Sequence, residues 1–346
     1  FCKRFYEMSN TDYSNLAGDL LDGIIDNVGK GDCQSIFRRS AGLPSAISAL
    51  LKCEPTGMKL NIFPKVLNRL HHLSSHDVQG HPEIRIHALN ILKFIYQDSE
   101  LKNDMDQYIA QGLALAIKGF TDNDWSVRNS SLMLYSAIMK RVFVNVSNES
   151  QANYKSGLNI IQFFAMRAPS LLKFFFEEIL QYSKKSTEHN MYPTLYPISL
   201  ILSKLLPFDV KTADKDPEGA QDEGLVEGAT KEEPTEGMCL DDIDDEAKNR
   251  YITPSEISQF RSLLLACANG RNFLGRVLVA RAIVPFVSVG DMHGFLDSIL
   301  PKTLKEVKRD HNNTHGRLLI AKFVIANFKS FCVGSNYRLE SNVPGP

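Results

Sequence analysis

The sequence lacks a long uncharged apolar run. Its most apolar stretch, Ile160 to Leu180, is interrupted by charged residues that include Arg167, Lys173 and Glu177. A helix that crosses a bilayer needs roughly 20 nearly uncharged residues. We therefore expect no membrane span in this chain.

Cysteine is also scarce. The 346 residues contain six cysteines, far apart in the sequence and with no C-x-x-C pair. Zinc sites and disulfide frameworks depend on such spacing, so neither is expected. This pattern favours a reduced, cytosolic setting.

Recognisable catalytic motifs are missing as well. The chain has no G-x-S-x-G, P-loop or H-E-x-x-H motif, and Gly29-Lys30-Gly31 is not followed by the third glycine of a nucleotide loop. Five histidines fall between His71 and His87, but without metal-ligand spacing to cysteines or carboxylates, and a polar turn explains them better than a metal site. We expect no catalytic centre, no metal and no cofactor on this chain.

Acidic charge is concentrated in one segment. Residues 211–249 hold 14 Asp and Glu against 4 Lys, while the whole chain has a net charge of −1. With few large apolar residues, this segment cannot offset the entropy cost of ordering, and we predict a disordered insertion. The rest of the chain is mildly basic, which is compatible with nucleic acid binding. Residues 336–346 are expected to be unstructured.

What the sequence does contain is helical periodicity. Apolar residues recur every three or four positions in Ile84 to Tyr96, Asp124 to Phe143 and Leu274 to Val287. Pro285 should kink or end the last of these helices, because it removes a backbone donor and clashes with the preceding turn. Alternating strand patterns are absent. We predict an all-α fold.

A repeat is visible within this pattern. Ile84-Arg85 and Val127-Arg128 each begin an apolar helix and lie 43 residues apart, within the period of HEAT or armadillo helix pairs. Acidic residues before Val127 are expected to cap its helix, and Arg276 can hold the matching place in a third repeat. The prediction is a HEAT/armadillo-like α-solenoid over residues 1–210 and 250–335, whose surface positions other molecules.

Three polar clusters are candidate binding sites for RNA or a protein partner. Each also has a structural alternative. The first cluster, at Arg38 and Arg39, could bond helix ends or acidic side chains. The second, at Arg128 and Asn129, could tie repeats together through Asp122 or Asp124, and the third, from His311 to His315, could cap a helix. Trp125, next to the second cluster, is expected to fill the core. The candidate residues are Arg38, Arg39, Arg128, Asn129, His311, Asn312 and His315.

These clusters lie in blocks that resemble one protein family. Five runs resemble, in the same order, blocks of the thyroid adenoma-associated (THADA) proteins and their fungal counterparts. The runs are Arg38 to Pro44, His87 to Leu92, Trp125 to Ser131, Ala280 to Val287 and His311 to Leu319. The resemblance covers nearly the whole chain outside the acidic insertion. Family members are several times longer, so we interpret the chain as an internal piece.

The resemblance implies a function that composition alone does not indicate. Such proteins are non-catalytic partners of an FtsJ-type tRNA methyltransferase, which methylates the ribose 2′-hydroxyl of the first nucleotide of the anticodon loop, nucleotide 32. S-adenosylmethionine would bind the enzyme, and the solenoid would hold the tRNA so that one ribose reaches the methyl donor. A general protein–protein scaffold without an RNA role is the alternative.

Overall fold

The computed structural model describes residues 16–29, 42–54, 62–75, 82–147, 159–160, 163–164, 168–185, 193–207, 252–306 and 310–334. Within these ranges the regular structure is helical, and the only β-type pairing is an isolated bridge between Asn159 and Leu206. No helix in the described part is long and apolar enough to cross a membrane. The predicted all-α fold is therefore confirmed.

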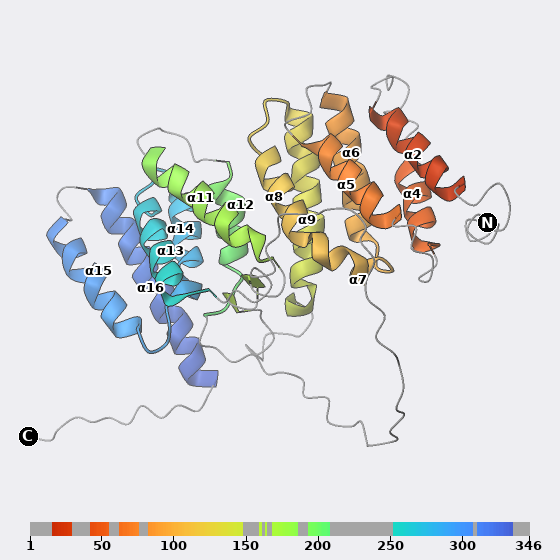
Figure 1. Cartoon of the computed structure of the whole chain (residues 1–346). Helices are drawn as coiled ribbons and strands as arrows, with labels where there is room; N and C mark the ends of the chain where they lie inside the picture. The colour runs from red at the N-terminus through yellow and green to blue at the C-terminus, as the bar shows by residue number, and fades with distance from the viewer. Residues whose placement is uncertain are drawn as a thin grey trace, which may run out of the picture.

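In the described part of the chain, the main helices form six consecutive pairs that run along a rod (Figure 1). Each pair packs chiefly against the pairs before and after it. The short α7 (Lys102–Met105) and the 3₁₀ turn Asp106–Tyr108 lead into the third pair. The pairs are α2 (Leu16–Gly29) with α4 (Leu43–Lys52), α5 (Ile62–Ser74) with α6 (Pro82–Gln97), α8 (Ile109–Gly119) with α9 (Trp125–Ser147), α11 (Ser170–Lys185) with α12 (Leu195–Leu202), α13 (Pro254–Cys267) with α14 (Phe273–Ala282), and α15 (Met292–Glu306) with α16 (His311–Gly334).

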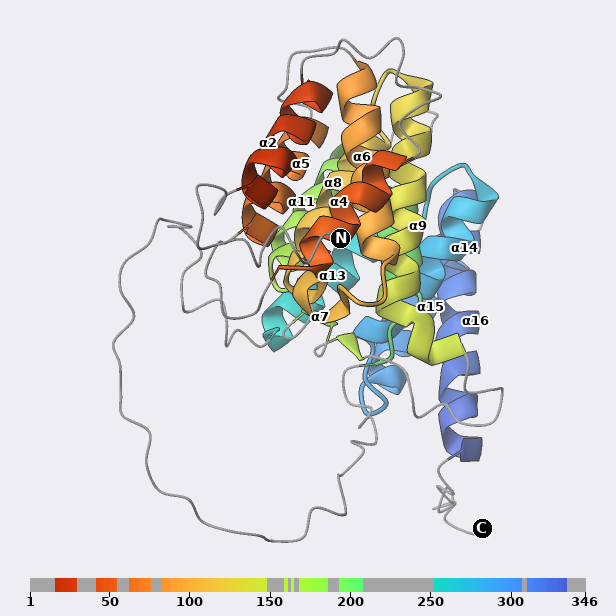
Figure 2. The ribbon, with the colours of Figure 1, turned by 90° about the vertical axis from the view of Figure 1, so that its right-hand side faces the viewer.

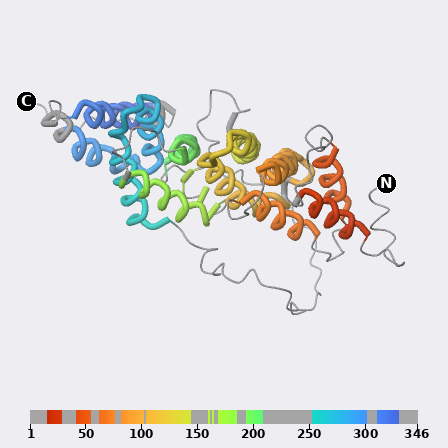
Figure 3. Tube along the Cα trace, turned by 90° about the horizontal axis from the view of Figure 1, so that it is seen from above, coloured from red at the N-terminus to blue at the C-terminus, as the bar shows by residue number. Residues whose placement is uncertain are grey.

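The pairs stack so that their helices form two layers. The first helix of each pair belongs to one layer, here called the first layer, which comprises α2, α5, α8, α11, α13 and α15. The second layer comprises α4, α6, α9, α12, α14 and α16. A view from above shows the two layers (Figure 3), and in an end-on view α5 and α11 lie on one side of the rod and α9, α14 and α16 on the other (Figure 2). This is the arrangement of an α-solenoid.

The core lies between the layers, where the apolar stripes of the helices meet. It runs along the rod through fully buried side chains such as Leu21, Leu92, Ile138, Phe260 and Phe286. Stacking is required because one helix pair has no other surface on which to bury its apolar stripe. The sequence periodicity therefore determines the layers as well as the helices.

Small residues let adjacent helices approach closely at two points. A Cβ added to Gly119 of α8 would overlap the side chain of Ser131 on α9, and one added to Gly112 would overlap the ring of Tyr96 on α6. Ser131 is fully buried. The small side chain of Ser131 therefore lets α8 and α9 approach closely at this point.

The predicted helices agree closely with those observed. Helices α6 and α9 correspond to the first two predicted segments, and α14 ends at Ala282, before a 3₁₀ turn (Val284–Phe286) that contains Pro285. The predicted disordered insertion, 211–249, and the predicted unstructured end, 336–346, lie outside the described residues.

Candidate functional site

Three helices of the second layer begin with the same kind of cap. The side-chain oxygen of Asp124 accepts hydrogen bonds from the N–H groups of Ser126 and Val127 at the start of α9. Asn272 accepts from the N–H of Gly275 in α14. Asp310 accepts from two N–H groups in the first turn of α16. Each cap satisfies amide groups that have no partner within their helix, and at α16 Asp310, not a histidine, supplies it.

An arginine occupies the fourth position of α6, α9 and α14, namely Arg85, Arg128 and Arg276. Arg128 Nη1 donates to the main-chain oxygens of Asp122 and Asn123, at 2.7 and 2.9 Å. Arg276 Nη1 donates to the oxygens of the residues six and five positions before it, at 2.6 and 2.9 Å. The two contacts are equivalent, which confirms the expectation that Arg276 holds the same place in another repeat.

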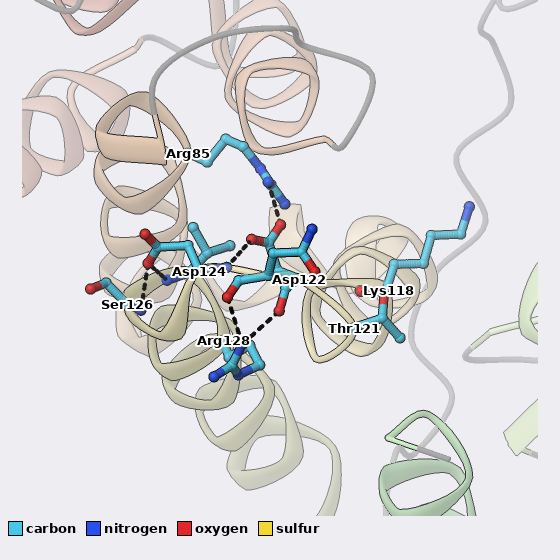
Figure 4. Close-up of polar contacts among 9 residues, drawn as sticks. Arg85, Lys118, Thr121, Asp122, Asp124, Ser126 and Arg128 are labelled. Carbon is cyan, nitrogen blue, oxygen red and sulfur yellow. Dashed lines mark hydrogen bonds and ion pairs between the residues drawn. The ribbon is translucent and has the colours of Figure 1, made fainter. Parts of the chain in front are cut away.

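Arg85 makes the connection between repeats that was expected of Arg128 (Figure 4). Its guanidinium forms an ion pair with the carboxylate of Asp122, in the turn before α9. Both side chains are largely buried, so each needs the other as a charged partner. The prediction that Arg128 ties repeats through a carboxylate is therefore wrong, because Asp122 presents its backbone oxygen to Arg128 and its carboxylate to Arg85.

Arg276 connects α14 to α16 and gathers two of the predicted site residues. Its Nε atom donates to Nδ1 of His315 at 3.1 Å, and its Nη1 atom donates to Oδ1 of Asn312 at 3.1 Å. The ring of Phe273 lies against the imidazole of His315, with ring centroids 5.6 Å apart. The cluster is thus built from the first turns of two adjacent helices.

The first residue of these helices points outward. Trp125 is 68% exposed and Phe273 is 55% exposed, and His311 is also exposed. The expectation that Trp125 fills the core is wrong. At the first position of α9 the indole lies beyond the layer of packed helices, while the buried stripe begins with Val127.

The candidate site residues thus differ in their positions and contacts. Asn312 and His315 lie together, bound to Arg276, while Arg128 holds the turn before α9. Asn129 follows it on α9 and is half-buried. Arg38 and Arg39 lie outside the described residues. Arg276 was not among the site candidates, although its fourth position after a capping residue was a usable signal.

The histidines between His71 and His87, which were considered for a metal site, differ in their burial. His71 is buried, and its Nδ1 atom lies 2.9 Å from the main-chain oxygen of Leu67. Burial lowers the pKa of His71 to about 4, and burial also lowers the pKa of His87. His72 is exposed. In the described part of the chain, no three His, Cys, Asp or Glu side chains are grouped so that they could hold a metal ion.

Stacked helix pairs, joined through buried arginines, define a repeat protein of the α-solenoid class. The family model THADA/TRM732, DUF2428 matches residues 1–126, and the model Trm732, C-terminal TPR repeats, matches residues 128–225 and 242–324. The chain therefore belongs to the THADA/Trm732 family.

Relatives from distant organisms agree with this assignment. The "tRNA (32-2'-O)-methyltransferase regulator THADA" of Gallus gallus is 28% identical over 84% of this chain, and the regulator trm732 of Schizosaccharomyces pombe is 27% identical over 59% of it. The THADA regulator of Drosophila melanogaster is 31% identical over 41%. The chain spans only 13% of the chicken protein and 14% of the fission yeast protein. No solved structure matches it.

Proposed function

We propose that the protein is a non-catalytic regulatory subunit of an FtsJ-type tRNA methyltransferase, and that it positions tRNA for 2′-O-methylation of nucleotide 32. The observation that carries the proposal is the match of two successive THADA/Trm732 family models to most of the chain. The relatives are named as regulators of a tRNA (32-2'-O)-methyltransferase. A rod of stacked helices suits this role, because holding one ribose at a methyl donor is catalysis by positioning.

Under this proposal S-adenosylmethionine binds the enzyme, and this chain contacts the enzyme and tRNA in the cytosol, the setting that the cysteine pattern favours. The candidate contact residues stay Arg38, Arg39, Arg128, Asn129, His311, Asn312 and His315. Of these, exposed His311 is the best placed for direct contact, because Arg128, Asn312 and His315 also have hydrogen bonds within the chain.

The test is to remove the gene and map ribose methylation in anticodon loops. Methylation of nucleotide 32 should disappear and return when the full-length protein is restored. In purified form, methyl transfer should require the enzyme, with no transfer from S-adenosylmethionine by this protein alone. Unchanged methylation after gene removal contradicts the proposal.

The salt dependence of binding distinguishes this proposal from the alternative, a general protein scaffold without an RNA role. Binding through several phosphates weakens steeply as salt is added. The reason is that binding releases counterions from the RNA, and their release is less favourable at a higher salt concentration. An apolar protein interface changes little. We expect tRNA binding by the full-length protein to show the steep dependence.

A further inference from the structure

The second layer of helices is almost free of carboxylates. The six helices of the first layer contain eight acidic and nine basic residues. Those of the second layer contain one acidic residue, Glu83. Against it stand eleven basic residues: Lys52, Arg85, Lys93, Arg128, Lys140, Arg141, Arg276, Arg281, Arg317, Lys322 and Lys329. Basic residues are about equally frequent in the two layers, but the net positive charge is concentrated in the second layer because its helices contain almost no carboxylates.

Part of this charge is used inside the fold, and part faces solvent. Arg85 and Arg276 are buried and join repeats. In contrast, Lys140, Arg281 and Lys322 are exposed, and the described part of the structure shows no ion pair for any of the three. Lys329, farther along α16, is likewise exposed. Within the described part of the structure, these side chains can therefore meet an external anion without first breaking an ion pair.

The same layer also carries most of the exposed apolar side chains. Within the described residues, eleven large apolar residues are exposed, and nine of them lie in the second layer. All four exposed aromatic residues are among these nine. The nine are Phe94, Trp125, Leu132, Met133, Tyr196, Phe273, Leu274, Leu318 and Ile325.

These residues form stripes that adjoin across helices. Along α9, the exposed positions Trp125, Leu132, Ser136 and Lys140 recur at helical spacing and so share one face. Lys93 Nζ of α6 lies 3.8 Å from the sulfur of Met133, so the stripes of α6 and α9 adjoin. The α14 and α16 stripes adjoin through the guanidinium of Arg281, which lies 4.9 Å from the centre of the Phe323 ring.

The combination fits a polyanion with unpaired bases. A protein partner presents charges of both signs, and a face suited to it normally includes carboxylates as well as cations. Cations combined with exposed aromatic rings are the features by which proteins hold single-stranded nucleic acid, the cations at phosphates and the rings stacked on bases. RNA loops offer both.

We propose that the outward face of α6, α9, α12, α14 and α16 is the surface on which this protein holds tRNA. Lys140, Arg281, Lys322 and Lys329 contact phosphates. Trp125 and Phe273 stack on unpaired bases of the anticodon loop. This inference rests on the proposed function, from which the identity of the RNA is taken. It adds to it the face of the rod that meets the RNA.

The experiment compares two triple charge reversals in the full-length protein. The test variant carries Lys140→Glu, Lys322→Glu and Lys329→Glu on the second layer. The control carries Lys118→Glu, Lys173→Glu and Lys184→Glu, which are exposed positions of α8 and α11 in the first layer. Both change the net charge equally, so non-specific attraction falls equally. Binding of a tRNA transcript is followed by fluorescence anisotropy over a range of salt concentrations.

The test variant should bind tRNA at least about tenfold more weakly, with a salt slope smaller by about 2, since each lost phosphate contact removes roughly 0.7–0.9. The control should stay within about twofold of the natural protein. Trp125→Ala should weaken binding with an unchanged salt slope, and Trp125→Phe should restore most of it, because stacking does not depend on counterion release.

Equal effects of the two triple variants would overturn the proposal. So would a test variant that keeps its tRNA affinity but no longer binds the methyltransferase, which would make this face a protein interface. Circular dichroism of each variant shows whether it is folded, and Trp125→Phe provides a second comparison that leaves the charge unchanged. Failure of the proposed function is detected separately, as absence of nucleotide 32 methylation by the natural protein with its enzyme.

Discussion

Arg276 and His315 are joined by a hydrogen bond of 3.1 Å from Nε of the guanidinium to Nδ1 of the imidazole. Arginine has only donors, so His315 must accept, and its neutral ring then carries the proton on Nε2. The same guanidinium bonds two main-chain oxygens before α14 and the amide oxygen of Asn312. One buried side chain therefore fixes both the start of α14 and the position of α16.

Arg276→Lys should destabilise the chain by about 2–4 kcal/mol, because a single ammonium group cannot replace a planar fork that reaches four acceptors. The free energy of unfolding from denaturant titration measures the change. Arg271→Lys is the matched control, because that side chain is exposed and its contact with Arg276 is made by the main-chain oxygen. Similar losses in the two variants would contradict the role given to Arg276.

Asp122→Asn should cost about 3 kcal/mol, because it leaves the buried guanidinium of Arg85 without its charged partner. Asp124→Asn is the control, because asparagine also caps helices and the change should stay within about 0.5 kcal/mol. The double variant Arg85→Met with Asp122→Leu should be more stable than Asp122→Asn, since it removes both charges. If the double variant is instead the least stable, the pair itself contributes net stability.

Gly316→Ala should be strongly destabilising, by about 3 kcal/mol or more. A Cβ at this position of α16 would overlap the main-chain carbonyl of Ala268, and backbone cannot move aside as a side chain can. Gly294→Ala in α15 meets no atom within 4 Å and should stabilise by about 0.5–1 kcal/mol through helix propensity. Thermal unfolding of the two variants should therefore shift in opposite directions.

Acid should weaken the fold through His71. Burial lowers its pKa to about 4 from an ordinary value of 6.5, so the unfolded chain binds a proton that the folded chain refuses. Stability is then full above about pH 6.5 and falls as the pH drops to about 4, with a total loss near 3 kcal/mol. His71→Gln should reduce this pH dependence in denaturant titrations, whereas exposed His72→Gln should leave it intact. An unchanged profile in His71→Gln would show that the histidine is not the titrating group.

The helices and their repeat could be predicted from the sequence because their signals are local. Apolar spacing defines a helix within a few turns, and the spacing between Arg85 and Arg128 shows that the unit recurs. The place of Arg276 followed from the same register. Each of these inferences needs only residues that are close in the sequence.

The contacts of the site could not be predicted in the same way. Whether Arg128 or Arg85 takes the carboxylate of Asp122 depends on where the turn before α9 meets α6. The exposure of Trp125 depends on how far the neighbouring helices extend past the start of α9. The scarcity of carboxylates in one layer becomes visible only when each helix has been assigned to its layer.

Each helix pair packs mainly against the pairs beside it, so the rod has no single core whose loss would unfold all the pairs together. The α15/α16 pair has one neighbouring pair among the described helices, and its amide hydrogens should exchange sooner than those of α8 and α9. A ligand lying across several pairs would tie these separately opening units together. Binding of such a ligand would then slow the opening of every helix pair that the ligand spans, including helices that the ligand does not contact.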